Sequence, residues 1–386
     1  MFNNLFTNLT LGLRDSINNL AIIRIKNIIM HYSFRLSALI LAFILWFPLA
    51  GISQISNPDD ELTTLEADMI MAQTLEGSHF NEFWNYQFYF NNGMKVHITF
   101  SAANFGSLKD PVTGVRISVF NDDDELYQLA REYPLPRLIQ DNEKYLFKLR
   151  DDRDLYFKGK LPERHRVVIK TSKDGVEYDI DLRLSNIQKG FKLGDGKYQI
   201  GGEQVGIVTH IPYAEASGHV TINGNRERVN GTAYMDHTWQ NQTTTRLMHS
   251  GYRVIVHNDS KNWDLLYVML PNESSNNETI GHRVINSDGE LHSASVENID
   301  VIASQSAFGS KIPRIIDMNL SNDSSIRISR SEDEERFTVL GELSWIARRA
   351  ARTFLGGEVI DYRGEATLMQ TGVRPKHGEY NFFFVD

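Results

Sequence analysis

The chain has 386 residues, of which 41% are hydrophobic and 11% aromatic, and its formal net charge is -9. This length fits about two or three domains, and the acidic balance argues against a nucleic-acid partner, because such proteins usually carry a basic face. The sequence contains no cysteine, which excludes disulfides, thiolate catalysis and a zinc–cysteine site.

Residues 1–53 have the features of a targeting segment. The uncharged apolar run 36–50 follows Arg35 and ends in small residues, which is the order of a secretory signal peptide. We therefore expect export to the periplasm or the extracellular space. The alternative is a membrane anchor at 36–50, although a spanning helix requires about 20 apolar residues. Met30 lies where a signal peptide would begin and is a candidate start.

Residues 57–75 are expected to form a short helix. Asn57 and Pro58 fit the N-cap and the first helical position, and apolar residues recur at helical spacing from Leu62 to Ala72. We expect this helix to pack as a plug against the larger part of the chain, without a chemical role.

From residue 83 the apolar period changes to two, which predicts β-strands. The clearest strand is 176–185, where apolar and charged residues alternate after the turn Lys173-Asp174-Gly175. Further strands are expected at 96–100, 115–119, 219–222, 251–258, 263–270, 326–330, 337–340, 358–369 and 380–385. Short strands with regular turn signals predict an all-β, antiparallel barrel or sandwich.

Residues 344–355 interrupt the β-pattern. They are rich in Ala and Arg and are followed by Gly356-Gly357, which predicts a helix. We expect this helix to close the mouth of a barrel with its arginines in solvent. The alternative is a basic surface helix that makes peripheral contact with anionic membrane lipid.

The stretch 229–242 places an acid, an imidazole and an indole in a sequence otherwise suited to a strand. Because side chains alternate along a strand, Asp236 shares one face with Tyr234, and His237 shares the other face with Trp239. Asp236 and His237 therefore form no side-by-side pair unless a bulge re-aims one of them.

The pattern of Gly231, Tyr234, Asp236-His237 and Trp239 resembles the hallmark of the lipocalin-like family that includes hydroxyneurosporene synthase (a carotenoid hydratase), the AttH proteins and fungal survival-factor relatives. The aromatic hairpin at 86–105 and the segment 362–366 also resemble this family. The resemblance implies two tandem lipocalin-like antiparallel β-barrels. We expect the first barrel at 76–205 and the second, which carries the Asp-His-x-Trp motif, at 206–386.

The family includes enzymes that hydrate, cyclise or isomerise hydrophobic terpenoid-like molecules, and proteins without an assigned activity. An alkene hydratase needs a carboxylic acid kept protonated in a dry apolar pocket. The resemblance gives that role to Asp236, with His237 or His249 relaying a proton. The expected ligand-binding residues are Tyr234, Trp239, His249 and Tyr252, whose aromatic faces would hold a developing cation.

Two functions remain open. The first is an exported binding protein for an apolar small molecule, in which Asp236 and His237 only form hydrogen bonds where the barrels meet. The second is a cofactor-independent hydratase, isomerase or cyclase, in which Asp236 is a general acid inside an apolar cavity. No motif requires a metal, nucleotide or flavin, and the sequence predicts no oligomeric state. The lesser candidates are Tyr213, Glu215, His210 and Arg253.

Overall fold

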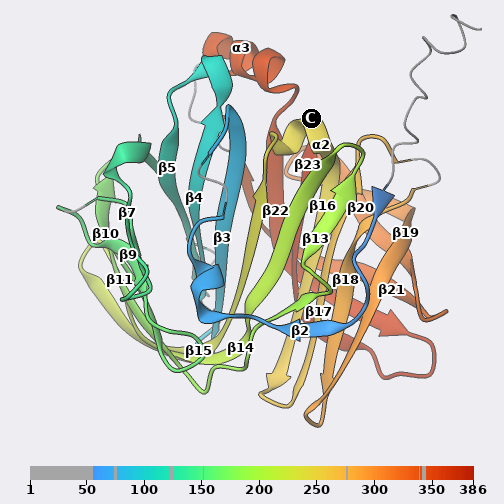
Figure 1. Cartoon of the computed structure of the whole chain (residues 1–386). Coiled ribbons are helices and arrows are strands. Elements are labelled where there is room, and N and C mark those ends of the chain that lie inside the picture. The colour runs from blue at the N-terminus through green and yellow to red at the C-terminus, as the bar shows by residue number, and fades with distance from the viewer. Residues whose placement is uncertain are drawn as a thin grey trace, which may run out of the picture. The chain divides into compact units, whose positions relative to one another are not determined.

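The computed structural model describes residues 55–73, 76–121, 125–150, 152–274, 277–338, 340 and 345–386. These ranges form two antiparallel sheets, one curled and one closed into a barrel (Figure 1), so the predicted all-β class is confirmed. The signal segment, the alternative anchor and the start at Met30 lie outside the described residues and stay predictions. None of the helices in the described ranges has the length and apolar character that a membrane crossing needs.

The main path of the curled sheet is built from residues 79–240, and β1 and β2, described below, pair beside it. Its strands, in spatial order, are β6 (Leu126–Pro134), β5 (Val112–Phe120), β4 (Lys95–Phe105), β3 (His79–Phe90), β15 (Asn225–Gln240), β14 (Glu203–Ile222), β11 (Val176–Ser185), β10 (His165–Lys173), β9 (Leu155–Lys158), β8 (Leu146–Lys148) and β7 (Ile139–Asp141). Apart from Glu82, every second residue of β3 from Phe80 to Phe90 lies in an aromatic core with Phe100, Phe147 and Phe157. The pairing of β3 with β15 places Trp84 opposite His237.

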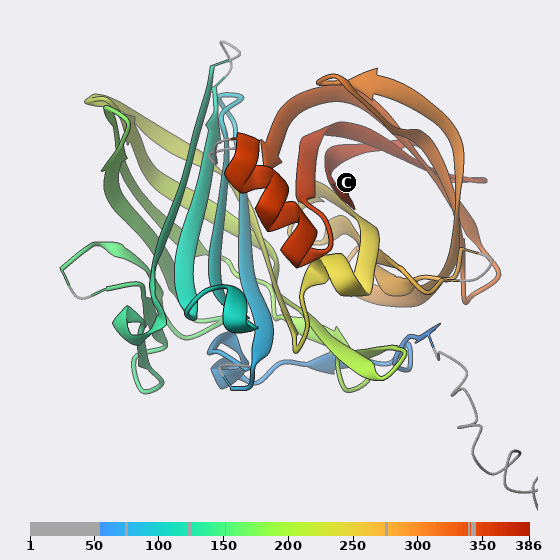
Figure 2. The same cartoon turned by 90° about the horizontal axis from the view of Figure 1, so that it is seen from above.

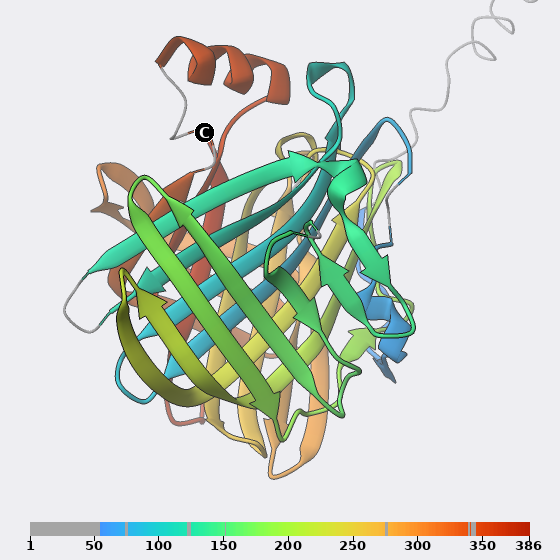
Figure 3. The same cartoon turned by 90° about the vertical axis from the view of Figure 1, so that its left-hand side faces the viewer.

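The edges of the curled sheet, β6 and β7, are not joined by a backbone ladder. The β10–β11 hairpin lies on the same side of the sheet as β6 (Figure 3), and side-chain hydrogen bonds link the two. Arg131 donates to the carbonyl of Ser172, and Lys173 donates to the carbonyl of Ala130 at 3.2 Å. The predicted pair of barrels is therefore one closed barrel and one curled sheet, a half-barrel whose edge is held by side chains.

The closed barrel contains β16 (Met248–Asp259), β17 (Asn262–Pro271), β18 (Ile280–Ser287), β19 (Glu290–Ala307), β20 (Ser310–Leu320), β21 (Ser325–Thr338), β22 (Val359–Gln370) and β23 (Lys376–Val385). It follows β15 through the short helix α2 (Thr244–Leu247). The change from one sheet to the other therefore falls between residues 240 and 248, not at the expected boundary of 205. Alternation along β14 and β15 predicts strands but not the sheet they join, which depends on their pairing with β11 and β3.

The predicted helix at 57–75 is wrong for the described part of that segment. β1 (Ile55–Ser56) pairs with β13 (Lys197–Ile200), and β2 (Leu62–Thr64) pairs with β12 (Phe191–Leu193). Only Ala67–Ile70 is helical, as the 3-10 helix η1. Asn57 does not cap a helix, because its side chain binds the backbone of Gly281 and Val296 on the barrel. Tertiary contacts thus override the local helix signals. Two further 3-10 turns, η2 (Gly106–Leu108) and η3 (Leu135–Arg137), connect strands.

Ion pairs join the outer face of the curled sheet to the barrel, and we call this contact the sheet–barrel seam. Lys95 on β4 binds Glu334 at 2.5 Å, Glu379 at 3.0 Å and Glu365 at 3.5 Å. The neighbouring His97 binds Glu335 at 3.3 Å, and burial lowers the pKa of His97 to about 4. Charges taken out of water require such partners.

The predicted helix at 344–355 is confirmed as α3 (Trp345–Leu355), which lies near the meeting of the curled sheet and the barrel (Figure 2). Its arginines do not all face solvent. Arg348 binds the buried Glu358 at 2.8 Å, and Arg352 binds Asp386 at 2.9 Å. These ion pairs attach α3 to β22 and to the end of the chain.

The seam generates a pH prediction at Glu379. Burial raises the pKa of Glu379 to about 7, with Lys95 partly opposing the shift. The folded state therefore binds a proton that the unfolded state releases, so stability falls as pH rises from about 4.5 to about 7. The contribution is on the order of 3 kcal/mol. In denaturant titrations, Glu379→Gln should flatten this fall, and parallel pH profiles for the variant and the parent would contradict the assignment.

Candidate functional site

Asp236 lies at the sheet–barrel seam. It is fully buried on β15, where Asn85 of β3 donates to its Oδ1 at 2.8 Å. Its Oδ2 lies 2.6 Å from Nε of Arg253 on β16 of the barrel. Burial acts to lower the pKa of Arg253, but the Asp236 carboxylate together with Tyr234, Tyr267 and Asp361 outweighs it, and the net shift is upward. Arg253 also donates to Asn381 at 2.7 Å. Asp236 is therefore held as an acceptor between two charged or polar partners.

His237 points the other way, into the interior of the curled sheet. Its Nε2 lies 2.7 Å from Oε1 of Glu82 on β3, and both residues are completely buried. Its Nδ1 lies 3.4 Å from Nε2 of His210 on β14. We call Glu82, His237 and His210 the buried relay. The alternation argument therefore holds: Asp236 and His237 serve different environments.

A β-bulge places His210 in the buried relay. The register of β14 against β15 shifts between Thr209 and Ile211, so His210 is the extra residue. A bulge re-aims a side chain out of regular alternation. The bulge that the sequence argument allowed on the motif strand thus occurs on its neighbour. His210 was a lesser candidate, and Glu82 was missed because no local pattern marks it.

The hydrogen-bond network assigns the proton positions of the buried relay. Oε1 of Glu82 also accepts the backbone N–H of Gln73 at 2.7 Å, so it acts as an acceptor and His237 carries its proton on Nε2. His210 then donates from Nε2 to Nδ1 of His237. Burial, with His237 and His165 nearby, lowers the pKa of His210 well below its usual value, which keeps His210 neutral. A proton can therefore move along hydrogen bonds without an exposed charge.

A second hydrogen-bonded pair lies in the same interior. Oη of Tyr86 is 2.8 Å from Nε2 of His165, whose Nδ1 faces the carbonyl of Gly159 at 3.2 Å. The carbonyl fixes the donor at Nδ1, so Tyr86 donates to His165. Burial raises the pKa of Tyr86 well above its usual value and lowers that of His165 to about 4, so both groups are neutral.

Two indoles frame His237. Trp84 stacks on it with ring centroids 4.6 Å apart, and Trp239 lies 5.0 Å away at 49°. Trp239 is only partly buried and faces Gly206 across the β14–β15 ladder. A Cβ at Gly206 would lie 2.0 Å from the Trp239 ring, so only glycine leaves room for the indole.

The other predicted site residues are not brought together. Tyr234 is buried at the seam with Tyr213, in an apolar cluster that includes Trp263. Tyr252 points into the barrel and stacks on Phe382 at 4.7 Å, while its neighbour Arg253 faces Asp236. His249 and Glu215 are exposed. Of the predicted set, only His237 and Trp239 lie together in the interior of the curled sheet, and Asp236 and Tyr234 lie on its opposite side.

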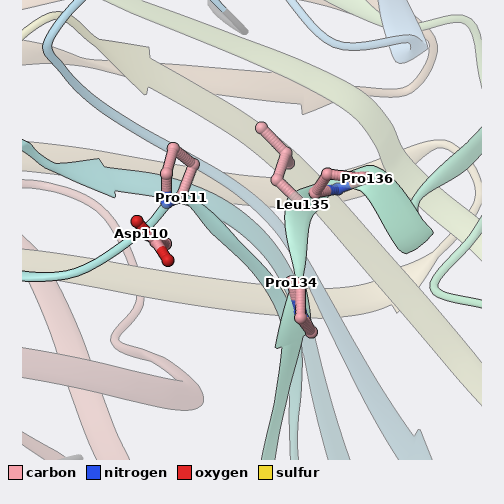
Figure 4. A pocket seen from close by; sticks show the side chains of 5 residues that line it. All are labelled: Asp110, Pro111, Pro134, Leu135 and Pro136. Carbon is pink, nitrogen blue, oxygen red and sulfur yellow. The ribbon is translucent and has the colours of Figure 1, made fainter.

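One open pocket lies elsewhere, beside the start of β5 and the end of β6 (Figure 4). Its volume is about 450 Å³, and its lining residues are Asp110, Pro111, Pro134, Leu135 and Pro136. None of them belongs to the buried relay. Within the described ranges, no group of three or more His, Asp or Glu side chains is arranged to hold a metal ion. The chemistry that the described residues offer is proton transfer beside aromatic faces.

The Asp236–Arg253 pair gives a stability prediction. Asp236→Asn leaves the buried guanidinium of Arg253 without a counter-charge, and breaking such a pair typically costs about 3–5 kcal/mol. The loss should appear as reduced free energy of unfolding in denaturant titrations. The matched control is Asp317→Asn, which breaks an exposed pair with Arg327 and should cost about 0–1 kcal/mol. Equal losses in the two variants would rule out a special role for the buried pair.

Gly206 gives a second prediction. Gly206→Ala forces the Trp239 indole away from His237, and overpacking of this kind costs about 1–3 kcal/mol. Thermal unfolding should report the loss, and Trp fluorescence should report the altered indole environment. Gly202→Ala is the control, because a Cβ there has open space. A Gly206→Ala protein as stable as the Gly202→Ala protein would show that the indole position is not fixed by this contact.

No protein-family model matches the sequence, and neither does any curated protein. Solved structures do match. An AttH-like protein of Nitrosomonas europaea has a TM-score of 0.58 at 15% identity, covering 83% of this chain and 97% of its own. Kievitone hydratase of Nectria haematococca has a TM-score of 0.52 at 14% identity, covering 85% and 97%. CghA, in a structure with Sch210972, has a TM-score of 0.58 at 9% identity, covering 85% and 94%.

These likenesses concern the fold, because all three identities are low. They extend over most of the chain and nearly the whole of each neighbour. The resemblance drawn from the Asp-His-x-Trp stretch is thus confirmed at the level of architecture: the chain has the lipocalin-like fold of the AttH-like protein, kievitone hydratase and CghA.

Proposed function

We propose that the chain binds an apolar small molecule on the concave side of the curled sheet and catalyses cofactor-independent acid–base chemistry on it, of the hydratase or cyclase type. The observation that carries the proposal is the buried relay, with its 2.7 Å and 3.4 Å contacts among aromatic side chains. A protein that only binds an apolar ligand has no use for three linked titratable groups there. The name of kievitone hydratase, a structural neighbour, supports the reaction class.

The proposed reaction starts from the buried relay carrying one additional proton, so that a His237 imidazolium, paired with Glu82, transfers a proton to one carbon of a double bond. The π electrons form the new C–H bond, and the positive charge develops on the other carbon. The faces of Trp84 and Trp239 stabilise this cation by cation–π attraction. Water, or a nucleophilic group of the same molecule, then bonds to the cationic carbon, and its released proton returns to the buried relay. The first outcome is hydration and the second is cyclisation.

Asp236 takes a positioning role in this proposal rather than that of general acid. Its Oδ1 accepts from Asn85 and its Oδ2 is ion-paired with Arg253, so the group is not placed to donate a proton to a ligand in the sheet interior. Through β15 it fixes the strand that presents His237 on the opposite face. Binding without catalysis is the competing function, and it is the outcome that the following experiment would reveal.

The test compares turnover in variants of the two faces of β15. The substrates are kievitone and whichever apolar molecule native mass spectrometry identifies in protein purified from its own host. Product is detected by mass spectrometry in oxygen-labelled water. His237→Gln and Glu82→Gln should each lower kcat by about 10²–10⁴-fold, the usual contribution of acid–base catalysis. Each should leave ligand affinity within a few-fold of the parent.

The control is Asp236→Asn, assayed per folded molecule at a temperature where it remains folded. It should keep turnover within about tenfold of the parent, because its partner groups lie outside the site. Full activity in His237→Gln would overturn the relay, and a loss confined to Asp236→Asn would restore Asp236 as the general acid. Tight binding with no turnover in any protein would establish the binding function instead.

A further inference from the structure

Tyr362 on β22 carries a polar group that the fold leaves unused. Its side chain is completely buried inside the closed barrel, stacked on Phe384 with centroids 5.8 Å apart. Its hydroxyl has no hydrogen-bond partner among the described residues. A buried hydroxyl without a partner destabilises the fold relative to phenylalanine at the same position. Packing alone therefore does not account for a tyrosine here.

Arg336 on β21 lies directly opposite Tyr362 in the strand register. Residues paired in this way face the same side of a sheet, with Cβ atoms about 4.5–5.5 Å apart. The flanking residues face the seam, since Glu335 binds Arg363 and Phe337 lies beneath Arg116. Alternation therefore directs Arg336 to the inner side of the barrel wall, beside Tyr362.

The charge of Arg336 is not compensated by the described residues. Its side chain is half-buried, and its Nε is shielded from solvent without a hydrogen-bond partner. Glu358 and Asp386, which flank β22 and β23, are already engaged, because Glu358 binds Arg348 and Asp386 binds Arg352. A guanidinium and a hydroxyl with free donors thus lie side by side at one end of the barrel.

An apolar surface adjoins these donors. Phe308, in the turn between β19 and β20, lies 6.2 Å from the Tyr362 ring and is 48% exposed. Its φ of 48° is in the left-handed region, which a bulky side chain rarely adopts. Gly309 also has a positive φ, as a two-residue hairpin turn requires, so the turn itself holds Phe308 in this position. Phe384 and Phe382 continue the aromatic surface inward.

We propose that this end of the closed barrel is a second binding site, in which Arg336 and Tyr362 hold the carboxylate of an apolar acid and Phe308 covers its hydrocarbon part. A guanidinium matches a carboxylate with two parallel hydrogen bonds, and the tyrosine hydroxyl adds a third donor. The ligand class is an aliphatic or aromatic carboxylic acid. The site is separate from the buried relay, which lies in the other sheet.

The experiment titrates the full chain with cis-parinaric acid and with its methyl ester, using the fluorescence that each gains in an apolar site. The parent should bind the acid about ten- to hundredfold more tightly than the ester, the range expected for charge-assisted hydrogen bonds. Arg336→Gln and Tyr362→Phe should each reduce affinity for the acid at least about tenfold and leave affinity for the ester unchanged. Tyr362→Phe should also keep or raise the melting temperature, because it removes an unpartnered hydroxyl.

The control is Arg327→Gln, which removes the same charge from an exposed arginine of the same strand and should leave affinity for the acid unchanged. Equal affinity of the parent for acid and ester would overturn the proposal. So would equal losses in Arg327→Gln and Arg336→Gln, or a lower melting temperature in Tyr362→Phe without a selective loss of the acid. Loss of acid binding in His237→Gln but not in Arg336→Gln would place the carboxylate on the curled sheet and also overturn it.

Discussion

Alternation of side chains along β15 governs the polar chemistry of the molecule. From Ala233 to Gln240 the strand has a concave face beside aromatic residues and an outer face covered by the barrel, so polar groups on either face of this part are largely cut off from water. Each must then find a partner inside the protein. Asp236 finds Arg253 across the seam, and His237 finds Glu82 and His210 across the sheet. One strand thus carries a structural ion pair on one side and a proton relay on the other.

The seam is held by ion pairs, although a purely apolar contact would also remove surface of the two sheets from water. Ion pairs that lose their water contribute little net stability, but an unpaired partner is costly, so they disfavour every alignment except the one that matches each charge. Lys95 among its glutamates and Arg253 beside Asp236 therefore act chiefly as alignment contacts between the two sheets. Because Asp236 and His237 are neighbours in β15, this alignment also fixes the strand that presents the relay.

The sequence predicted much of the local structure, because local structure follows periodicity and turn residues. Period-two alternation identified the strands, and Ala/Arg-rich residues before a Gly-Gly pair identified α3. The opposite orientations of Asp236 and His237 also followed from alternation alone. The helix expected at 57–75 failed because Asn57 binds the barrel backbone instead of capping a helix. Local signals of this kind yield to tertiary hydrogen bonds.

The relay was less predictable, because its partners are distant in the sequence. Glu82 lies 155 residues from His237, and His210 reaches it only through a bulge that no turn residue announces. Tyr252 is separated from the motif for a different reason. The curled sheet covers this wall of the barrel, so Arg253 is buried on the outer face beside Asp236, and alternation turns Tyr252 into the barrel interior. Sequence alone does not reveal which outer surface is covered.

The unclosed edge of the curled sheet is a compromise between two structural requirements. An exposed strand edge invites pairing with another chain, whereas a fully closed ladder resists widening. Hydrogen bonds from Arg131 and Lys173 to backbone carbonyls occupy part of the edge while leaving β6 and β7 without a continuous ladder. Parting this edge breaks a few side-chain contacts rather than a row of backbone bonds. Opening the half-barrel at this edge therefore requires fewer broken hydrogen bonds than opening it along one of its long strand ladders.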